Sequence, residues 1–152
     1  MAPTTTRYEA PGGGLTCAED TRLVNDDVAH TRSGRAVLVV EDDQGIGKML
    51  VALLSAEGYQ PTLVTDGSQA LEALRDLRPA LVTLDLSLPG MDGVEVLERM
   101  DADSDRRVPV VVVSAYTDRL TAAHRARASA VLTKPFEIDT LLSCISSALA
   151  ED

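Results

Sequence analysis

The chain has 152 residues, of which 45% are hydrophobic and only 3% are aromatic, and its formal net charge is -10. This composition fits a single packed domain with a modest extension, whose core must consist of Val, Leu, Ile and Ala. The acidic charge argues against a nucleic-acid partner, because proteins that bind phosphate backbones carry basic patches. No run approaches the ~18 apolar residues of a membrane span, and the N-terminus lacks the apolar core of a secretion signal. We therefore expect no membrane partner.

The two cysteines lie in unlike surroundings. Cys17 belongs to a polar leader, whereas Cys144 belongs to an apolar pattern of helical spacing. A disulfide framework is not expected from such a pair, and the reducing cytoplasm is the expected location.

Residues 1–33 differ in composition from the rest of the chain. They contain a Thr triplet, two prolines and the run Gly12–Gly14, but few large apolar residues and no sustained periodicity. We interpret 1–33 as an N-terminal extension that is mostly disordered, within which 18–28 could form a short helical turn. The folded domain is expected over 34–152.

From residue 36 onward, an apolar run of strand length alternates repeatedly with an amphipathic helical stretch. The near-continuous Val, Leu and Ile runs are typical of parallel strands that are buried on both faces. This alternation predicts a doubly wound α/β fold with a five-stranded parallel sheet in the flavodoxin-like order 2-1-3-4-5. The predicted strands cover 36–41, 60–64, 80–84, 109–113 and 130–133, and the predicted helices cover 45–57, 67–77, 93–101, 118–127 and 137–150.

Some residues mark the ends of these elements. Asp66 and Asp92 each precede a glycine at the start of a predicted helix, where an aspartate is a favoured N-cap. Pro79 prevents the second helix from continuing. The last predicted helix ends just before Asp152, so we expect a stand-alone domain without an output domain after it.

Polar side chains follow four of the predicted strands, at the point where each strand ends. Asp42 follows the first strand, Asp85 the third, Ser114 the fourth and Lys134 the fifth. The carboxyl ends of parallel strands open into one crevice, where ligands bind. The four side chains are therefore expected to converge there, and together they suit a divalent cation and a phosphoryl group.

The carboxylates of this set predict a Mg²⁺ site. Mg²⁺ binds through one or two carboxylates together with phosphate oxygens and water. Asp42 and Asp85 can supply those carboxylates, because the first and third strands are neighbours in the expected strand order. Glu41 or Asp43 could add a ligand through water, and the backbone carbonyl of Ser87 can reach the same cation. The alternative is an acidic loop that only caps the first helix, and for Asp43 both interpretations stay open.

Asp85 is the best candidate for a nucleophile. An aspartate carboxylate can attack a phosphoryl group and form an aspartyl-phosphate. The ammonium of Lys134 could neutralise phosphoryl oxygens, and the hydroxyl of Ser114 could donate a hydrogen bond to another. A cis bond before Pro135 would direct Lys134 into the crevice. Taken alone, Ser114 could be a turn residue and Asp85 a cap, so the hypothesis depends on the whole set.

Four segments now amount to a family signature. They are Val-Leu-Val-Val-Glu-Asp-Asp (37–43), Leu-Asp-Leu-Ser-Leu-Pro-Gly-Met-Asp-Gly (84–93), Val-Pro-Val-Val-Val-Val-Ser-Ala-Tyr (108–116) and Leu-Thr-Lys-Pro-Phe (132–136). In their order and spacing they closely resemble the receiver domain of bacterial two-component response regulators, over residues 35–150.

The resemblance implies a role for each matching residue. Asp85 corresponds to the phosphoacceptor, and Glu41 and Asp42 correspond to the family's acidic pair, with Asp42 as the direct Mg²⁺ ligand. Ser87 corresponds to the residue whose backbone carbonyl binds the metal. Ser114 corresponds to the switch hydroxyl, and Lys134 to the family's lysine. A sensor histidine kinase or a phosphotransfer protein is the implied phosphoryl donor, and the receiver catalyses its own phosphorylation and slow dephosphorylation.

The chain departs from the family pattern after the fourth strand. Val131 stands where the family usually carries an aromatic switch residue, and Tyr116 is the candidate to replace it. The segment from Ser114 to Lys134 is also shorter than usual, which indicates a short or irregular fourth helix. Within that segment, His124 is interpreted as a solvated surface residue.

The leading hypothesis is a single-domain response regulator that signals through an unknown protein target or a phosphorelay. One alternative is a degenerate receiver that binds partners without phosphorylation, which Val131 favours. The other is an α/β phosphatase, but such enzymes carry a second acid where this chain has Ser87. The apolar stripe of the last helix is interpreted mainly as core, and its other use, with Cys144, is a homodimer contact.

Overall fold

The computed structural model describes residues 34–100 and 106–150. The predicted extension over 1–33, with its helical turn, lies outside the described residues. The strands are β2 (Ala36–Val40), β3 (Gln60–Val64), β4 (Leu81–Leu84), β5 (Val110–Ser114) and β6 (Ala130–Thr133). The helices are α2 (Gln44–Ala56), α3 (Gly67–Leu77), α4 (Gly93–Met100), the 3₁₀ turn η1 (Thr117–Arg119), α5 (Ala122–Arg127) and α6 (Ile138–Ala150).

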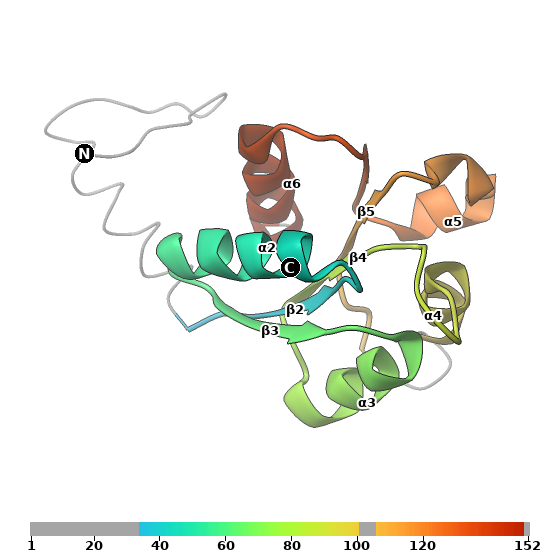
Figure 1. Cartoon of the computed structure of the whole chain (residues 1–152), viewed down its shortest axis with the longest axis horizontal. Helices are drawn as coiled ribbons and strands as arrows, with labels where there is room; N and C mark the ends of the chain where they lie inside the picture. Colours follow the sequence, from blue (N-terminus) through green and yellow to red (C-terminus); the bar gives the residue numbers. More distant parts are fainter. Residues whose placement is uncertain (1–33, 101–105, 151–152) are drawn as a thin grey trace, which may run out of the picture.

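The five strands form one parallel sheet in the order β3-β2-β4-β5-β6. Counted from the first strand of the sheet, this is the predicted flavodoxin-like order. Helices α2 and α6 cover one face, and α3 and α4 cover the other, with α5 beside α4 (Figure 1). The doubly wound architecture is therefore confirmed, and it places the first and third strands side by side at the switch point where ligands bind.

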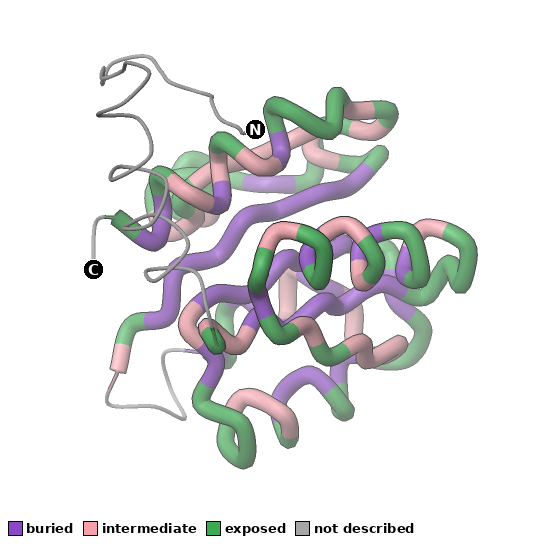
Figure 2. Tube along the Cα trace, turned by 90° about the vertical axis from the view of Figure 1, so that its left-hand side faces the viewer, coloured by how far each residue is buried: buried purple, intermediate pink, exposed green. Residues whose placement is uncertain are grey.

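The apolar strand runs supply both faces of the sheet with core residues. Along β2, Leu38 and Val40 pack toward α3 and α4, whereas Val37 and Val39 pack toward α2 and α6. Each of these four side chains is at most 1% exposed. Figure 2 shows the consequence, with buried strands running between helices whose outer sides are exposed. Burial on both faces explains why β2, β4 and β5 read as near-continuous apolar runs, whereas β3 at the edge of the sheet exposes Gln60 and Thr62.

Aspartate N-caps begin three of the helices. The side chain of Asp66 accepts a hydrogen bond of 2.8 Å from the amide of Gln69, and Asp92 accepts one of 3.1 Å from the amide of Glu95. Both predicted caps are confirmed. Asp43 caps α2 in the same way, which satisfies an amide that the helix itself leaves without an acceptor.

The region after β5 differs from the predicted helix over 118–127. The structure has η1 first, then Leu120 in an extended conformation and 7% exposed, and only then the six-residue α5. Thr121 begins α5 because its hydroxyl accepts a hydrogen bond from the amide of His124, whose ring in turn accepts one from the amide of Thr121. This capping box makes α5 begin later than the sequence pattern predicts. The helix is short, as expected.

His124 is also less exposed than predicted. Its side chain is only 14% exposed, and Nε2 lies 2.8 Å from Glu98 Oε2 on α4. The interpretation of His124 as a solvated residue is wrong, because its ring serves both the start of α5 and the contact with α4.

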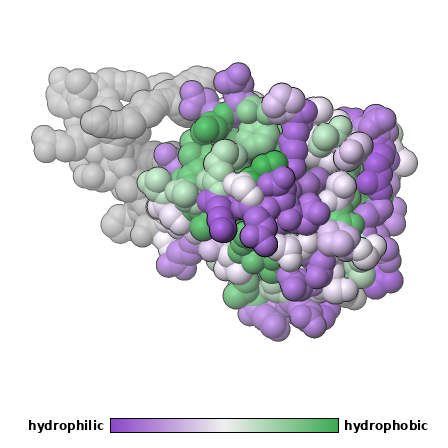
Figure 3. Space-filling view, viewed as in Figure 1, coloured by the Kyte–Doolittle hydropathy of each residue, from purple (hydrophilic) through white to green (hydrophobic). Residues whose placement is uncertain are grey.

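The outer surface is mixed in character. Figure 3 shows hydrophilic and hydrophobic residues interspersed on the face in view. On α6, Leu141, Ile145 and Leu149 are buried as predicted, whereas Ile138 is 45% exposed. None of the described helices has both the length and the apolar character that a membrane span requires.

Candidate functional site

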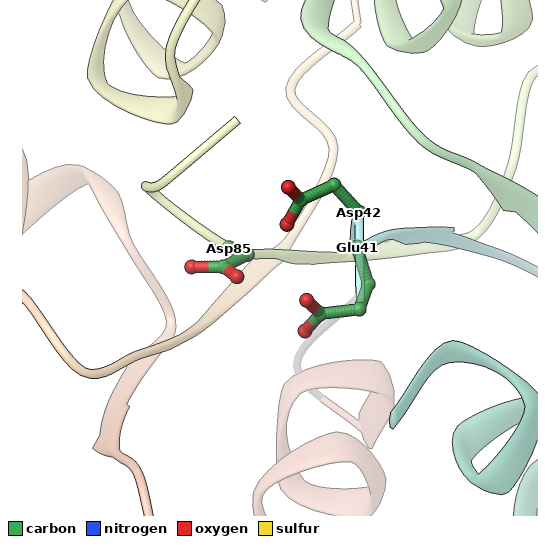
Figure 4. Close-up of side chains that lie close together, drawn as sticks. All are labelled: Glu41, Asp42 and Asp85. Carbon is green, nitrogen blue, oxygen red and sulfur yellow. The ribbon is translucent and has the colours of Figure 1, made fainter. Parts of the chain in front are cut away.

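The carboxyl ends of β2 and β4 bring together three acidic side chains. Val40 pairs with Leu84 across the two strands, and the amide of Asp85 donates a hydrogen bond of 3.0 Å to the carbonyl of Val40. Glu41 and Asp42, which follow β2, therefore lie beside Asp85. Each of the three offers a carboxylate oxygen within 4.8 Å of the others. Figure 4 shows the carboxylates of Glu41 and Asp42 reaching toward Asp85.

The cluster is open on one side only. Glu41 is 2% exposed and Asp85 is 5% exposed, whereas Asp42 is exposed to solvent. A hard divalent cation prefers oxygen ligands and keeps part of its water shell. A cluster with two enclosed acids and one exposed acid fits such an ion, since the exposed side leaves room for water. The donor set therefore fits Mg²⁺, and which atoms bind it remains a prediction.

Lys134 lies beside the cluster and follows β6, the strand at one edge of the sheet. Its backbone amide donates a hydrogen bond of 3.0 Å to the carbonyl of Ser114, so the lysine sits at the end of β6 beside β5. Its Nζ lies 3.0 Å from Asp85 Oδ2 and 2.8 Å from Glu41 Oε1. The Lys134–Pro135 bond is cis. The predicted convergence of Asp42, Asp85 and Lys134 is therefore confirmed as geometry.

These contacts shift the proton affinities of the three enclosed groups. Burial alone would raise the pKa of Asp85, but hydrogen bonds from the Ser87 amide and the Lys134 ammonium outweigh it and hold that pKa below its ordinary value. Burial raises the pKa of Glu41, and the neighbouring charge of Asp85 adds to that rise. Burial would lower the pKa of Lys134, but its two carboxylate partners raise it. Asp85 is thus held as an ionised carboxylate.

The loop from β4 to α4 folds closely around Asp85. The amide of Ser87 donates a hydrogen bond of 3.1 Å to Asp85 Oδ1, and Ser87 itself is exposed. At the far end of the loop, the amide of Gly93 donates to the carbonyl of Leu86 at 2.9 Å. The loop therefore returns to its own start before α4 begins. The role of the Ser87 carbonyl as a metal ligand remains a prediction.

Ser114 ends β5 and is fully buried. Its Oγ accepts a hydrogen bond of 3.1 Å from the amide of Tyr116, so the hydroxyl is bonded to its own loop. Tyr116 is 51% exposed, and Val131 packs half-buried against the core on the α3 and α4 side. The switch roles predicted for Ser114, Tyr116 and Val131 therefore stay predictions.

Two features of the site were not predicted from the sequence. Glu41 was expected to contribute through water, but it also accepts a direct hydrogen bond from Lys134 and one of 3.1 Å from the amide of Asp43. Arg119, in η1, forms an ion pair with Asp92 at the start of α4. The contacts of Lys134 with Glu41 and of Arg119 with Asp92 have no sequence signal, because each joins segments that only the tertiary fold brings together.

The site and the fold match known proteins. The model of the response regulator receiver domain family matches residues 37–146. The chain is 41% identical over 115 residues to the DNA-binding response regulator MtrA of Mycolicibacterium smegmatis, which covers 74% of this chain and 50% of that protein. It is 36% identical over 115 residues to sporulation initiation phosphotransferase F of Bacillus subtilis, which covers 74% of this chain and 92% of that protein.

A solved structure agrees with these matches. A CheY-like response regulator receiver domain from Methylobacillus flagellatus superimposes with a TM-score of 0.70 at 27% identity, covering 76% of this chain and 99% of that one. The chain spans about half the length of the MtrA relatives that it matches.

Proposed function

The chain belongs to the response regulator receiver domain family, and we propose that it accepts a phosphoryl group on Asp85 and changes conformation in response. The family is one of phosphoacceptor signalling domains. One observation carries the proposal: the ammonium of Lys134 lies 3.0 Å from the enclosed Asp85 carboxylate, which is itself part of the acidic cluster. The proposed nucleophile Asp85, the ammonium of Lys134 and the carboxylates of Glu41 and Asp42 therefore lie close together.

The proposed reaction is an in-line phosphoryl transfer. An oxygen of Asp85 forms a bond to phosphorus while the phosphorus–nitrogen bond of a donor phosphohistidine breaks and the imidazole leaves with the electron pair. Lys134 neutralises charge on the transferred group, and the amide of Ser87 orients the attacking carboxylate. Bound Mg²⁺, held by Asp42, Asp85 and the Ser87 carbonyl with Glu41 acting through water, would supply further neutralisation of the phosphoryl oxygens. Slow self-catalysed dephosphorylation would reset the domain.

Phosphorylation would act through the loop after β5. The Ser114 hydroxyl would leave the amide of Tyr116 and donate a hydrogen bond to a phosphoryl oxygen. Such a ligand shifts a two-state equilibrium by its differential affinity for the two states. Because Val131 replaces the aromatic residue that usually reports this change, we propose that the exposed Tyr116 reports it here.

The proposed partners follow from this chemistry. The phosphoryl donor is a sensor histidine kinase or a phosphotransfer protein, and the cytoplasm is the proposed location. The output is a protein–protein contact or a further phosphorelay step, with a homodimer as one such contact. The relative MtrA is a DNA-binding response regulator, whereas the matched region of this chain covers half of it. Because the formal net charge of this chain is -10 and proteins that bind phosphate backbones carry basic patches, we propose no nucleic-acid contact for this domain.

Mass spectrometry with a small phosphodonor tests the proposal. Incubation with acetyl phosphate and Mg²⁺ should add the mass of one phosphoryl group, and Asp85→Asn should abolish the gain. Removal of Mg²⁺ with a chelator should also abolish it. Asp76→Asn, at an exposed position on α3, serves as the matched control and should gain the group normally.

The same experiment separates the alternatives. A wild-type protein that gains no mass would contradict the proposal and favour a domain that binds partners without phosphorylation, the alternative that Val131 raises. Rapid turnover of many external phosphate esters would instead indicate a phosphatase.

A further inference from the structure

Arg119 joins the two loops that flank the phosphoacceptor. It lies at the end of η1, in the loop that follows Ser114. Its Nη2 forms an ion pair with Asp92 Oδ2, and its Nη1 lies 3.5 Å from the carbonyl oxygen of Leu86. Leu86 directly follows Asp85, and Asp92 caps α4. One guanidinium therefore contacts both ends of the loop between β4 and α4.

The segment between Ser114 and Arg119 is itself tied together. The amide of Tyr116 donates to Ser114 Oγ at 3.1 Å, and the amide of Arg119 donates to the carbonyl of Tyr116 at 3.1 Å. Thr117 adds a hydroxyl contact of 2.9 Å to Thr133 at the end of β6. Ser114, Tyr116 and Arg119 are therefore joined by consecutive hydrogen bonds within one short segment.

We propose that Arg119 is a positioning residue that holds the loop after Ser114 in its resting conformation. The contact of its guanidinium with Asp92 and Leu86, which we call the latch, stabilises the state in which Ser114 is bonded to Tyr116. This inference rests on the proposed function, because it concerns the response to a phosphoryl group on Asp85. In the proposed response the Ser114 side chain turns toward the phosphoryl oxygen and its Oγ leaves the Tyr116 amide, so the latch opposes that response.

The expected strength of the latch is modest. The two side chains are 39% and 38% exposed, and ion pairs at such sites are weakened by solvent. A weak contact still shifts a two-state equilibrium if it exists in one state only. Loss of the latch should therefore favour the phosphoryl-bound conformation by about 1.5-fold to fivefold.

A set of matched variants tests the latch. Arg119→Gln removes the charge, Arg119→Lys keeps it, and Asp92→Asn removes its partner while retaining an oxygen that can cap α4. Arg99→Gln is the control, because Arg99 forms a solvent-exposed ion pair of 3.1 Å with Glu95 on α4 itself.

The first readout is amide hydrogen exchange at Tyr116 in the unphosphorylated protein. Arg119→Gln and Asp92→Asn should each speed this exchange by about 1.5-fold to fivefold, Arg119→Lys should restore most of the protection, and Arg99→Gln should change nothing. Exchange in Arg119→Gln that matches Arg99→Gln would overturn the latch even if phosphorylation were normal.

The second readout is the affinity for beryllofluoride, a phosphoryl mimic, in the presence of Mg²⁺. Arg119→Gln should bind it about 1.5-fold to fivefold more tightly than Arg99→Gln. A purely structural role for Arg119 would lower stability and weaken binding instead, and that result would overturn the inference. A wild-type protein that neither binds beryllofluoride nor gains a phosphoryl group would overturn the proposed function, whereas the exchange readout judges the latch independently.

Discussion

Lys134 Nζ donates a hydrogen bond of 2.8 Å to Glu41 Oε1, although these residues lie 93 positions apart in the sequence. The Glu41 side chain is 2% exposed and that of Lys134 is 17% exposed. A carboxylate enclosed to this extent needs its cation, because burial of an unpaired charge is costly. The ammonium therefore stabilises the domain as well as facing Asp85, the proposed phosphoacceptor.

The first prediction follows from this pair. Lys134→Met should lower the free energy of unfolding by about 3 kcal/mol, because it leaves Glu41 buried without its cation. The double variant Glu41→Gln/Lys134→Met should recover at least half of that loss, since the neutral amide can still accept the hydrogen bond from Asp43. Urea denaturation measures both values at neutral pH. A double variant no more stable than Lys134→Met would show that Glu41 is not the group that needs the lysine.

The second prediction concerns the close packing of the loop between β4 and α4. A Cβ at Gly93 would lie 2.2 Å from the carbonyl oxygen of Asp85 and 2.5 Å from the Cα of Leu86. Both are backbone atoms, so the loop itself must shift. Gly93→Ala should lower the free energy of unfolding by about 2 kcal/mol or more and slow phosphoryl acceptance.

Gly45→Ala provides the matched control for Gly93→Ala. A Cβ at Gly45 would meet only the side chain of Asp43, at 3.3 Å, and alanine is the better helix former. Its stability should change by less than about 1 kcal/mol, with normal phosphoryl acceptance. Equal behaviour of the two variants in thermal melts and phosphorylation assays would contradict the role assigned to Gly93.

The sequence predicted those parts of the fold that local patterns determine. The strand runs, the caps at Asp66 and Asp92 and the flavodoxin-like order all depend on apolar period, cap chemistry and the handedness of parallel crossovers. The convergence of Asp42, Asp85 and Lys134 followed as well, because strand ends in such a sheet share one edge.

The remaining features depend on contacts between segments that are distant in sequence. His124 was interpreted as solvated because nothing local reveals Glu98 on another helix. The late start of α5 depends on a capping box that competes with the apolar pattern around Leu120. The pairing of Arg119 with Asp92 likewise has no sequence signal. Burial and long-range charge pairs are decided by the packed fold.

The third prediction concerns a buried hydroxyl under the site. Thr83 lies in β4, two residues before Asp85, and is 2% exposed. Within the described part of the chain, its Oγ1 has no hydrogen-bond partner. Thr83→Val replaces that hydroxyl by a methyl group of similar size, so it should raise the free energy of unfolding by about 1 kcal/mol.

Thr62→Val, on the exposed side of β3, is the control for Thr83→Val and should change stability by less than about 0.5 kcal/mol. Urea denaturation compares the two variants with the wild type. A destabilised Thr83→Val protein would indicate that the hydroxyl has a partner in solution, such as an enclosed water.

The fourth prediction is a pH dependence at Asp92. Its pKa lies below the ordinary value, first because its carboxylate accepts a hydrogen bond from the amide of Glu95, and further because Arg119 lies beside it. A carboxyl group whose pKa is lowered by folding stabilises the protein above its unfolded pKa, and that contribution disappears as the pH falls through the folded pKa. The advantage of wild type over Asp92→Asn should therefore be complete at pH 7 and shrink below about pH 4.

Urea denaturation of the wild type and Asp92→Asn across this pH range measures the difference directly. Asp76→Asn controls for the general effect of removing one negative charge from an acidic protein. If the gap between wild type and Asp92→Asn stayed constant down to pH 3, the ionised carboxylate would not be what holds Arg119 and the start of α4. If the difference in stability from the wild type disappears at low pH for Asp92→Asn but not for Asp76→Asn, the stability of the latch depends on the charge of the Asp92 carboxylate.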